Sequence, residues 1–227
     1  MARIIVFDVN ETLLDLKALQ PRFEQVFGDP GILSQWFAQL LQTSLVLTIT
    51  QQYQDFAVVG AAALTMVAAR RGITLSTEMK QYILQGMKTL PPHADVVPAL
   101  KRLREAGFRL ATLTNSPPHV AEAQLHHAEV ADFFEQRLSV DAARRYKPAP
   151  EAYQVAAAAF GIGLADIRLV AAHNWDATGA LHAGCHAAFV ARPGMVLNEL
   201  DLQPDIIGPD LSAVVEQILG RDQPSID

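Results

Sequence analysis

The sequence has one cysteine, Cys185, among 227 residues, which rules out an intrachain disulfide and suits a reducing cytoplasm. Its neighbours carry no metal-ligand spacing. The chain also lacks a basic run, and 18 Lys and Arg against 24 Asp and Glu give a formal net charge of −6. Nucleic acid and anionic membrane surfaces are therefore poor partners.

Long hydrophobic runs are missing as well. The longest apolar stretch, from about Phe56 to Ala69, is too short to span a membrane and contains Thr65. The apolar residues at positions 2–7 are interrupted by Asp8, so we expect no secretory signal. These features favour a cytoplasmic protein. The length allows one sizeable domain, or a main domain with a smaller insertion.

Short apolar runs rich in β-branched residues predict buried strands. They cover positions 3–7, 108–114, 167–172, 186–190 and 205–207. Helical periodicity covers positions 96–106, 150–160, 176–183 and 211–219, and Gly107 and Gly184 are placed to end two of these helices. Strands that alternate with helices indicate an α/β fold with a Rossmann-like, doubly wound parallel sheet.

One long segment breaks this alternation. From about Leu16 to Pro92 the pattern is helical, at positions 32–47, 57–70 and 77–89, with little strand signal. We therefore expect residues 1–15 and 93–227 to form the catalytic core and residues 16–92 to form a helical cap, inserted after the first strand. Such a cap would cover the carboxyl edge of the sheet, where open α/β sheets bind ligands.

Four polar clusters follow predicted strands or lie in loops at that same edge, so they can converge on one pocket. In chain order they are Asp8-Val9-Asn10-Glu11-Thr12, Thr114-Asn115-Ser116, Lys147-Pro148-Ala149-Pro150 with Tyr153, and His173-Asn174-Trp175-Asp176.

The order of these clusters resembles the four motifs of the haloacid dehalogenase superfamily, over essentially the whole chain. The resemblance implies an aspartate nucleophile at Asp8 and a hydroxyl group at Thr12. It further implies a substrate-anchoring Thr114, a charge-balancing Lys147 and an acidic Asp176. The helical insertion matches the cap between the first two motifs of that superfamily.

Most members of the superfamily are phosphatases, which need magnesium and a second aspartate two residues after the nucleophile. That position is Asn10 here, and an amide cannot serve as general acid and base. Where the phosphatases carry a Gly-Asp pair for the metal, this chain has Ala171-Ala172, which offers no side-chain oxygen. We therefore expect no metal and no cofactor. A magnesium-dependent phosphatase is the alternative.

The details are similar to the metal-independent branch, the type II 2-haloacid dehalogenases. Lys147-Pro-Ala-Pro with Tyr153, and the run that begins Trp175-Asp176, resemble that branch. The resemblance implies that Asp8 displaces halide from a small halocarboxylate to form an ester. Lys147 keeps Asp8 ionised, and Asp176 is the candidate base for the water that hydrolyses the ester.

Further groups are candidates for substrate binding. Backbone amides after Asp8, at Val9 and Asn10, and those of Thr114, Asn115 and Ser116 can cradle the substrate carboxylate. Asn174 and Tyr153 belong to the same clusters. An apolar wall suited to a small halocarbon is expected from aromatic side chains, namely Trp36, Phe37, Tyr53, Phe56 and Trp175.

Two departures separate this chain from the type II pattern. Members of that branch carry a halide-accepting arginine on the first cap helix, where this chain has Phe37 or Ala38. Gln39, Gln42 or Tyr53 could replace it, or the substrate differs. The second departure is His173, in a form that resembles a subgroup active on small haloacetates, fluoroacetate included. His173 can assist water activation, donate a hydrogen bond to fluoride, or simply be structural.

The missing arginine also keeps open a non-catalytic relative that binds a small acid or a protein partner. Family members are often dimers, so a homodimer is a further expectation.

Overall fold

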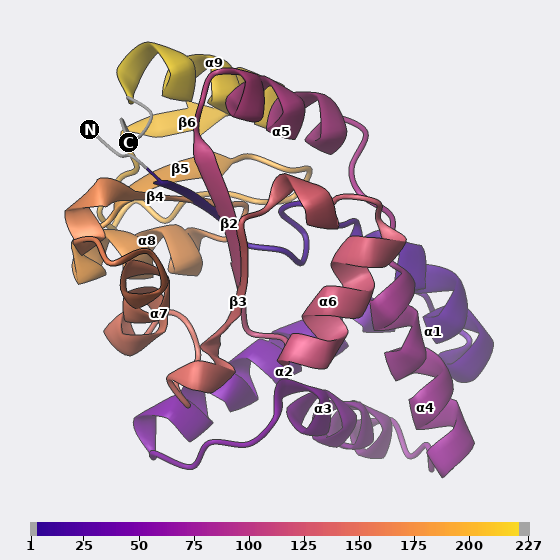
Figure 1. Ribbon diagram of the computed structural model, residues 1–227. Helices are drawn as coiled ribbons and strands as arrows, with labels where there is room; N and C mark the ends of the chain where they lie inside the picture. The colour runs from indigo at the N-terminus through magenta and orange to yellow at the C-terminus, as the bar shows by residue number, and fades with distance from the viewer. Residues whose placement is uncertain (1–3, 223–227) are drawn as a thin grey trace.

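The computed structural model describes residues 4–222 and forms one parallel sheet flanked by helices (Figure 1). Within the described residues the strand order is β3-β2-β1-β4-β5-β6, and every pairing is parallel. The strands are β1 (Ile4–Phe7), β2 (Arg109–Thr114), β3 (Gln136–Ser139), β4 (Ile167–Ala171), β5 (His186–Val190) and β6 (Ile206–Gly208).

The predicted Rossmann-like α/β fold is confirmed, including the five expected strands. Strand β1 lies in the middle, with Ile4 opposite Arg109 on one side and Ile167 on the other. The chain runs outward through β2 and β3, then returns to the other side of β1 for β4. Such a reversal opens a crevice at the carboxyl edge of the sheet. Arg3, which we included in the first strand, lies outside the described residues, as do positions 1–2 and 223–227.

The helices cover both faces of the sheet. In Figure 1, α5 and α9 pack on each other above it, and α7 and α8 pack on each other on the opposite side. These helices are α5 (Val96–Glu105), α6 (Pro118–His127), α7 (Pro150–Phe160), α8 (Asn174–Ala183) and α9 (Leu211–Arg221). Gly107 (φ 87°) and Gly184 (φ 97°) follow α5 and α8 in the left-handed region that favours glycine.

Four α-helices lie between β1 and α5 and gather at one side of the sheet (Figure 1). They are α1 (Gln20–Phe27), α2 (Ile32–Ile49), α3 (Phe56–Arg70) and α4 (Thr77–Gly86). Side chains of Asp55 and Ser76 accept hydrogen bonds from the first turns of α3 and α4, which fixes where these helices begin. One continuous cluster of buried apolar side chains joins these helices to the sheet.

Helices α1 and α6 were not among the expected helical ranges, and the structure also differs from the sequence expectation at β3 and α2. Strand β3 was not predicted because its residues, Gln136-Arg137-Leu138-Ser139, are polar and partly exposed at the sheet edge. The longest apolar helix is α2 rather than the segment from Phe56, and its 18 residues reach a mean hydropathy of 1.2. By length and composition α2 could cross a membrane, yet it packs along α3 and buries Trp36, Phe37 and Leu40 within the fold.

Candidate active site

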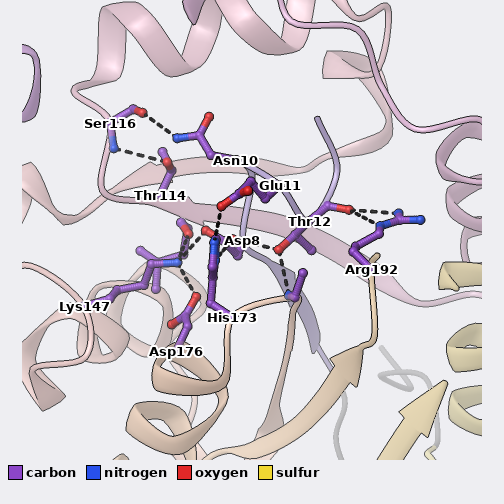
Figure 2. Close-up of polar contacts among 12 residues, drawn as sticks. Asp8, Asn10, Glu11, Thr12, Thr114, Ser116, Lys147, His173, Asp176 and Arg192 are labelled. Atoms are coloured by element: carbon purple, nitrogen blue, oxygen red, sulfur yellow. Dashed lines mark hydrogen bonds and ion pairs between the residues drawn. The ribbon is translucent and has the colours of Figure 1, made fainter. Parts of the chain in front are cut away.

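The nucleophile candidate, Asp8, follows β1 directly and is 4% exposed. Its amide donates to the Val170 carbonyl, which continues the β1–β4 pairing past the end of the strand. Its Oδ1 accepts from Lys147 Nζ at 2.8 Å, and its Oδ2 accepts from Thr12 Oγ1 at 2.7 Å. His173 Nδ1 lies 3.2 Å from the same Oδ2. The carboxylate is thus held in one orientation by groups from three segments of the chain (Figure 2).

Lys147 is the charge centre of the site. Its fully buried ammonium group donates to Asp8, to Asp176 Oδ2 at 2.6 Å and to the Leu113 carbonyl at 2.9 Å, so all three N–H bonds are used. Burial lowers the pKa of Lys147, but the two carboxylates outweigh this effect and raise it. Burial would raise the pKa of Asp8, and the cations of Lys147 and His173 instead hold it well below its usual range. Asp8 is therefore ionised.

Asp176 lies in the first turn of α8 and is completely buried. Its Oδ2 is bound to Lys147, and its Oδ1 accepts from the Tyr153 hydroxyl at 2.8 Å. Burial raises the pKa of Asp176; Lys147 opposes that rise, and the charge of Asp8 adds to it. Helix α8 can lie this close because Gly179 has no side chain, since a Cβ there would stand within 3 Å of Pro148 and the Tyr153 hydroxyl.

His173 bridges two carboxylates. Its Nδ1 faces Asp8, and its Nε2 lies 2.8 Å from Glu11 Oε2 (Figure 2). Burial lowers the pKa of His173, but the hydrogen bonds to these two carboxylates raise it to about 9. The ring of Trp175 stacks on the imidazole at 5.0 Å between centroids, and that of Phe37 lies at 6.0 Å.

The second cluster supports the loop after β1. Asn10 donates to Ser116 Oγ at 3.3 Å and accepts from the buried Gln124 at 2.9 Å. Thr114 accepts from the Ser116 amide, and the Asn115 side chain accepts from the Lys147 amide. The structure thus brings residues of all four predicted clusters together.

A cavity of about 420 Å³ opens beside this site, between α2 and the loops of the core. Glu11, Phe37, Ala38, His173 and Trp175 are among its lining residues, whereas Asp8 is not. Asn174 also lines it, and its amide lies 3.4 Å from Asp201 Oδ2. Val9 is fully buried and contributes its carbonyl to the turn at Leu13 and Leu14.

Several candidate residues on α2, on α3 and in the loop between them lie away from the cavity. The Tyr53 hydroxyl donates to Asp141 at 2.6 Å, and Gln39 bonds with Gln42 and Thr43 on its own helix. Trp36 of α2 donates to the Gly60 carbonyl of α3. Phe56 lines a separate cavity of about 40 Å³ near Ser116. Of the expected aromatic wall, Phe37 and Trp175 reach the main cavity.

Sequence reasoning missed two supporting residues, Gln124 behind Asn10 and Arg192. It placed Glu11 in the first cluster but did not predict its contact with His173. The Arg192 guanidinium donates to the Thr12 carbonyl at 2.9 Å and to Asp95 at 2.7 Å, which ties the first loop to the segment after β5. The available signal was that Arg192 and Gln124 each stand within an apolar segment, where a buried polar side chain needs a partner. The sequence does not say which partner each one contacts.

Magnesium does not fit this arrangement. The Asn10 oxygen is taken by Gln124, Ala171 and Ala172 supply no side-chain donor, and the carboxylates of Asp8 and Asp176 share the Lys147 ammonium. A cation that entered would meet that ammonium at hydrogen-bond distance from both of its prospective ligands. Across residues 4–222, no group of three or more His, Cys, Asp or Glu side chains is arranged to hold a metal ion.

Comparison with known proteins gives the class. A family model described as haloacid dehalogenase-like hydrolase matches residues 2–184. The chain therefore belongs to the haloacid dehalogenase-like hydrolases, as its motifs predicted.

Within that class, several similar relatives are dehalogenases. The chain is 31% identical to haloacetate dehalogenase H-2 of Moraxella sp. (strain B), over 94% of this chain and 96% of that protein. It is 30% identical to (S)-2-haloacid dehalogenase of Pseudomonas sp. (strain YL), over 93% and 92%. The structure of L-2-haloacid dehalogenase from Xanthobacter autotrophicus matches with a TM-score of 0.92 at 25% identity, covering 97% of this chain and 100% of that one.

Proposed function

We propose that this protein hydrolyses the carbon–halogen bond of a short 2-haloalkanoic acid through an ester on Asp8, without a metal. The observation that carries the proposal is a buried Asp8 that is kept ionised and oriented by Lys147 and Thr12, where magnesium does not fit. The relatives named above act on haloacetate and (S)-2-haloacids according to their names, which supports this substrate class.

In the first step, an oxygen of Asp8 attacks the carbon that bears the halogen. A carbon–oxygen bond forms as the carbon–halogen bond breaks, and the halide leaves with the bonding electrons. The low pKa of Asp8 means that no base is needed for this step. Lys147 offsets the repulsion between the anionic nucleophile and the anionic substrate.

The substrate carboxylate has candidate donors on two loops. We propose that the substrate carboxylate is bound by the backbone amides around Val9 and Asn10 and by the loop of Thr114, Asn115 and Ser116. Asn115, Lys147 and Trp175 line a small cavity of about 30 Å³ on this side of the site. Phe37 and Trp175 line the larger cavity with aromatic surface suited to a small halocarbon.

Two measurements test this function. Halide release from chloroacetate, fluoroacetate and both enantiomers of 2-chloropropionate is followed by ion chromatography with chelator present, and we expect release from at least one acid. Single turnover in heavy-oxygen water should place the label in Asp8, because water attacks the ester carbonyl. Label that appears only in the product would refute the ester mechanism.

We also propose a cytoplasmic location and a homodimer. Exposed apolar side chains on two cap helices support the dimer, namely Leu45, Val46 and Ile49 on α2 and Val58 and Met66 on α3. Light scattering after size exclusion gives the oligomeric state, and a monomer at micromolar concentration would refute this part.

A further inference from the structure

The segment that precedes Lys147 is bound by residues at the end of α2 and in the α2–α3 turn, residues 50–55. This segment runs from β3 to α7, and in Figure 1 it passes beside the end of α2. Lys147 must bring its ammonium group to Asp8, to Asp176 and to a backbone carbonyl at the same time. A side chain that serves three partners at once tolerates little displacement of its own backbone.

Two consecutive amides of this segment are bound from opposite sides. The Lys147 amide donates to Asn115 Oδ1 at 3.0 Å, on the side of the sheet. The Tyr146 amide donates to Thr48 Oγ1 at 3.2 Å, and Thr48 lies in the last turn of α2. The backbone of Lys147 is thus held between the edge of the sheet and α2.

The Tyr146 side chain adds to this attachment. It is fully buried, and its hydroxyl group donates to the Gln54 carbonyl. Its ring centroid lies 5.1 Å from that of Tyr53 and 5.6 Å from that of Phe56. Burial raises the pKa of the Tyr146 hydroxyl, which therefore stays a hydrogen-bond donor. Tyr146 is thereby fixed on the residues that connect α2 to α3.

A second set of contacts joins the same two parts of the chain closer to β3. The Tyr53 hydroxyl donates to Asp141 Oδ1 at 2.6 Å. The Arg144 guanidinium lies over the Tyr53 ring, 5.0 Å from its centroid, where a cation is attracted to the face of the ring. Arg144 has a φ of 50°, in the left-handed region that is uncommon for a residue with a side chain. The backbone therefore makes its turn toward Tyr146 against the Tyr53 ring.

Helix α2 also borders the Lys147 side chain directly. Leu41, Ser44 and Leu45 line the cavity of about 30 Å³ together with Lys147. A displacement of α2 would therefore reach Lys147 by two routes, through this packing and through Tyr146.

We infer that Tyr146 is a positioning residue for Lys147, and that Thr48 and the α2–α3 turn fix Tyr146 in place. The inference rests on the proposed function. It gives the end of α2 a part in the chemistry, although within residues 4–222 the side chains that hydrogen-bond to Asp8 are those of Thr12, Lys147 and His173.

The consequence of a displaced Lys147 concerns the charge on Asp8. Burial raises the pKa of Asp8, and Lys147 and His173 together hold it below its usual range. Asp176 competes for the same ammonium group, and Glu11 is bound to the other nitrogen of His173. If the ammonium moves away, Asp8 loses part of its cationic environment while it stays buried, so its pKa rises. A protonated Asp8 does not attack carbon, so halide release then falls as pH falls.

The central test removes the acceptor of the Tyr146 amide. Thr48→Val keeps the shape of the side chain, and the probe is chloroacetate, or 2-chloropropionate where that acid reacts faster. Per folded molecule and at saturating probe, we expect the first equivalent of chloride to appear about 10- to 100-fold more slowly, since a misplacement of about 1 Å can cost about 10²-fold in rate. The acidic limb of this rate should move to higher pH. Thr48→Ser keeps the hydroxyl group and should restore both the rate and the limb.

Thr50→Val and Tyr82→Phe are the matched controls. The exposed Thr50 hydroxyl donates to a carbonyl of α2 itself, and the Tyr82 hydroxyl of α4 donates to Gln25 on α1 at 2.7 Å. Both variants should release chloride like the wild type. Tyr146→Phe, which loses the bond to Gln54, should show a smaller loss than Thr48→Val and a shift of the limb in the same direction.

A role confined to folding predicts other results. Thr48→Val would then unfold at lower urea concentration but, per folded molecule, would keep the wild-type rate and pH limb, which would overturn the inference. Equal losses in Thr48→Val and Thr48→Ser would do the same, as would a slower rate with an unmoved limb.

These outcomes differ from a failure of the proposed function. Wild-type protein that releases no halide from any acid of the panel above refutes that function, and this inference with it. Active wild type with an unaffected Thr48→Val overturns the inference alone. Where Thr48→Val does not fold, the same two measurements on Tyr146→Phe decide.

Discussion

Replacing Lys147 with methionine would remove the cation shared by two buried carboxylates. In the wild type the ammonium lies 2.8 Å from Asp8 and 2.6 Å from Asp176, and its own side chain is fully buried. Methionine fills a similar volume but offers no charge and no hydrogen bond. The variant would therefore place two adjacent carboxylates in an apolar environment without their counter-ion.

The cost follows from the proton that one carboxylate must then take up. Burial and the charge of Asp8 already act to raise the pKa of Asp176, so we expect this group to become protonated. An ordinary aspartate has a pKa near 3.9, and holding it neutral at pH 7 costs about 4 kcal/mol at about 1.4 kcal/mol per pH unit. Removing one partner of a buried ion pair typically destabilises a protein by about 3–5 kcal/mol, which agrees with this figure.

The pH dependence has a definite sign. In the variant, the folded state binds a proton that the unfolded state gives up above pH 3.9, so the folded state gains stability as pH falls. The penalty should shrink by about 3 kcal/mol between pH 7 and pH 5. Urea unfolding of Lys147→Met and wild type at both values measures this difference. An equal penalty at both pH values would refute the buried-charge account and indicate a packing defect instead.

Three further predictions concern single residues. Asp8→Asn should abolish halide release with an unchanged circular dichroism spectrum, and sustained turnover would exclude Asp8 as the nucleophile. The pKa of His173 is about 9 in the folded state against about 6.5 in the unfolded state, so the roughly 3 kcal/mol of stability that it contributes below pH 6.5 is lost as pH rises through 9. Urea unfolding of His173→Asn as a function of pH should lack this loss. Equal pH dependence of unfolding free energy in variant and wild type would contradict the prediction. Gly179→Ala should crowd the Tyr153 hydroxyl, costing about 1–3 kcal/mol in thermal unfolding, whereas Gly220→Ala, with open space around it, should not.

Much of the fold could be predicted because its signals are local. A parallel sheet buries both faces of its inner strands, so β1 appears as a continuous apolar run and β4 and β5 as mostly apolar ones. Strand β3 gives no such signal, because it is an edge strand that pairs with β2 alone. Its Gln136 and Arg137 are typical of a loop until the neighbouring strand is known.

The site was predictable where its residues follow strands and unpredictable where they depend on distant partners. Asp8, Thr114 and His173 lie at strand ends, so topology alone brings them together. The contact between Asn10 and Gln124 joins positions 114 residues apart, and no periodicity encodes it. The same is true of Arg192, which reaches the Thr12 carbonyl across 180 residues.

The cations that touch Asp8 come from the core of the protein rather than from the helices above it. Helix α2 presents Phe37 and Ala38 to the cavity and has no charged residue along its length, so this helix offers no cation to an anion bound there. Lys147 and the imidazolium of His173 are the cations that touch Asp8. The lysine is fixed by two carboxylates, whereas the charge of the histidine depends on whether Asp8 is ionised. A site built in this way places both cations beside Asp8 while an anionic substrate binds and halide departs.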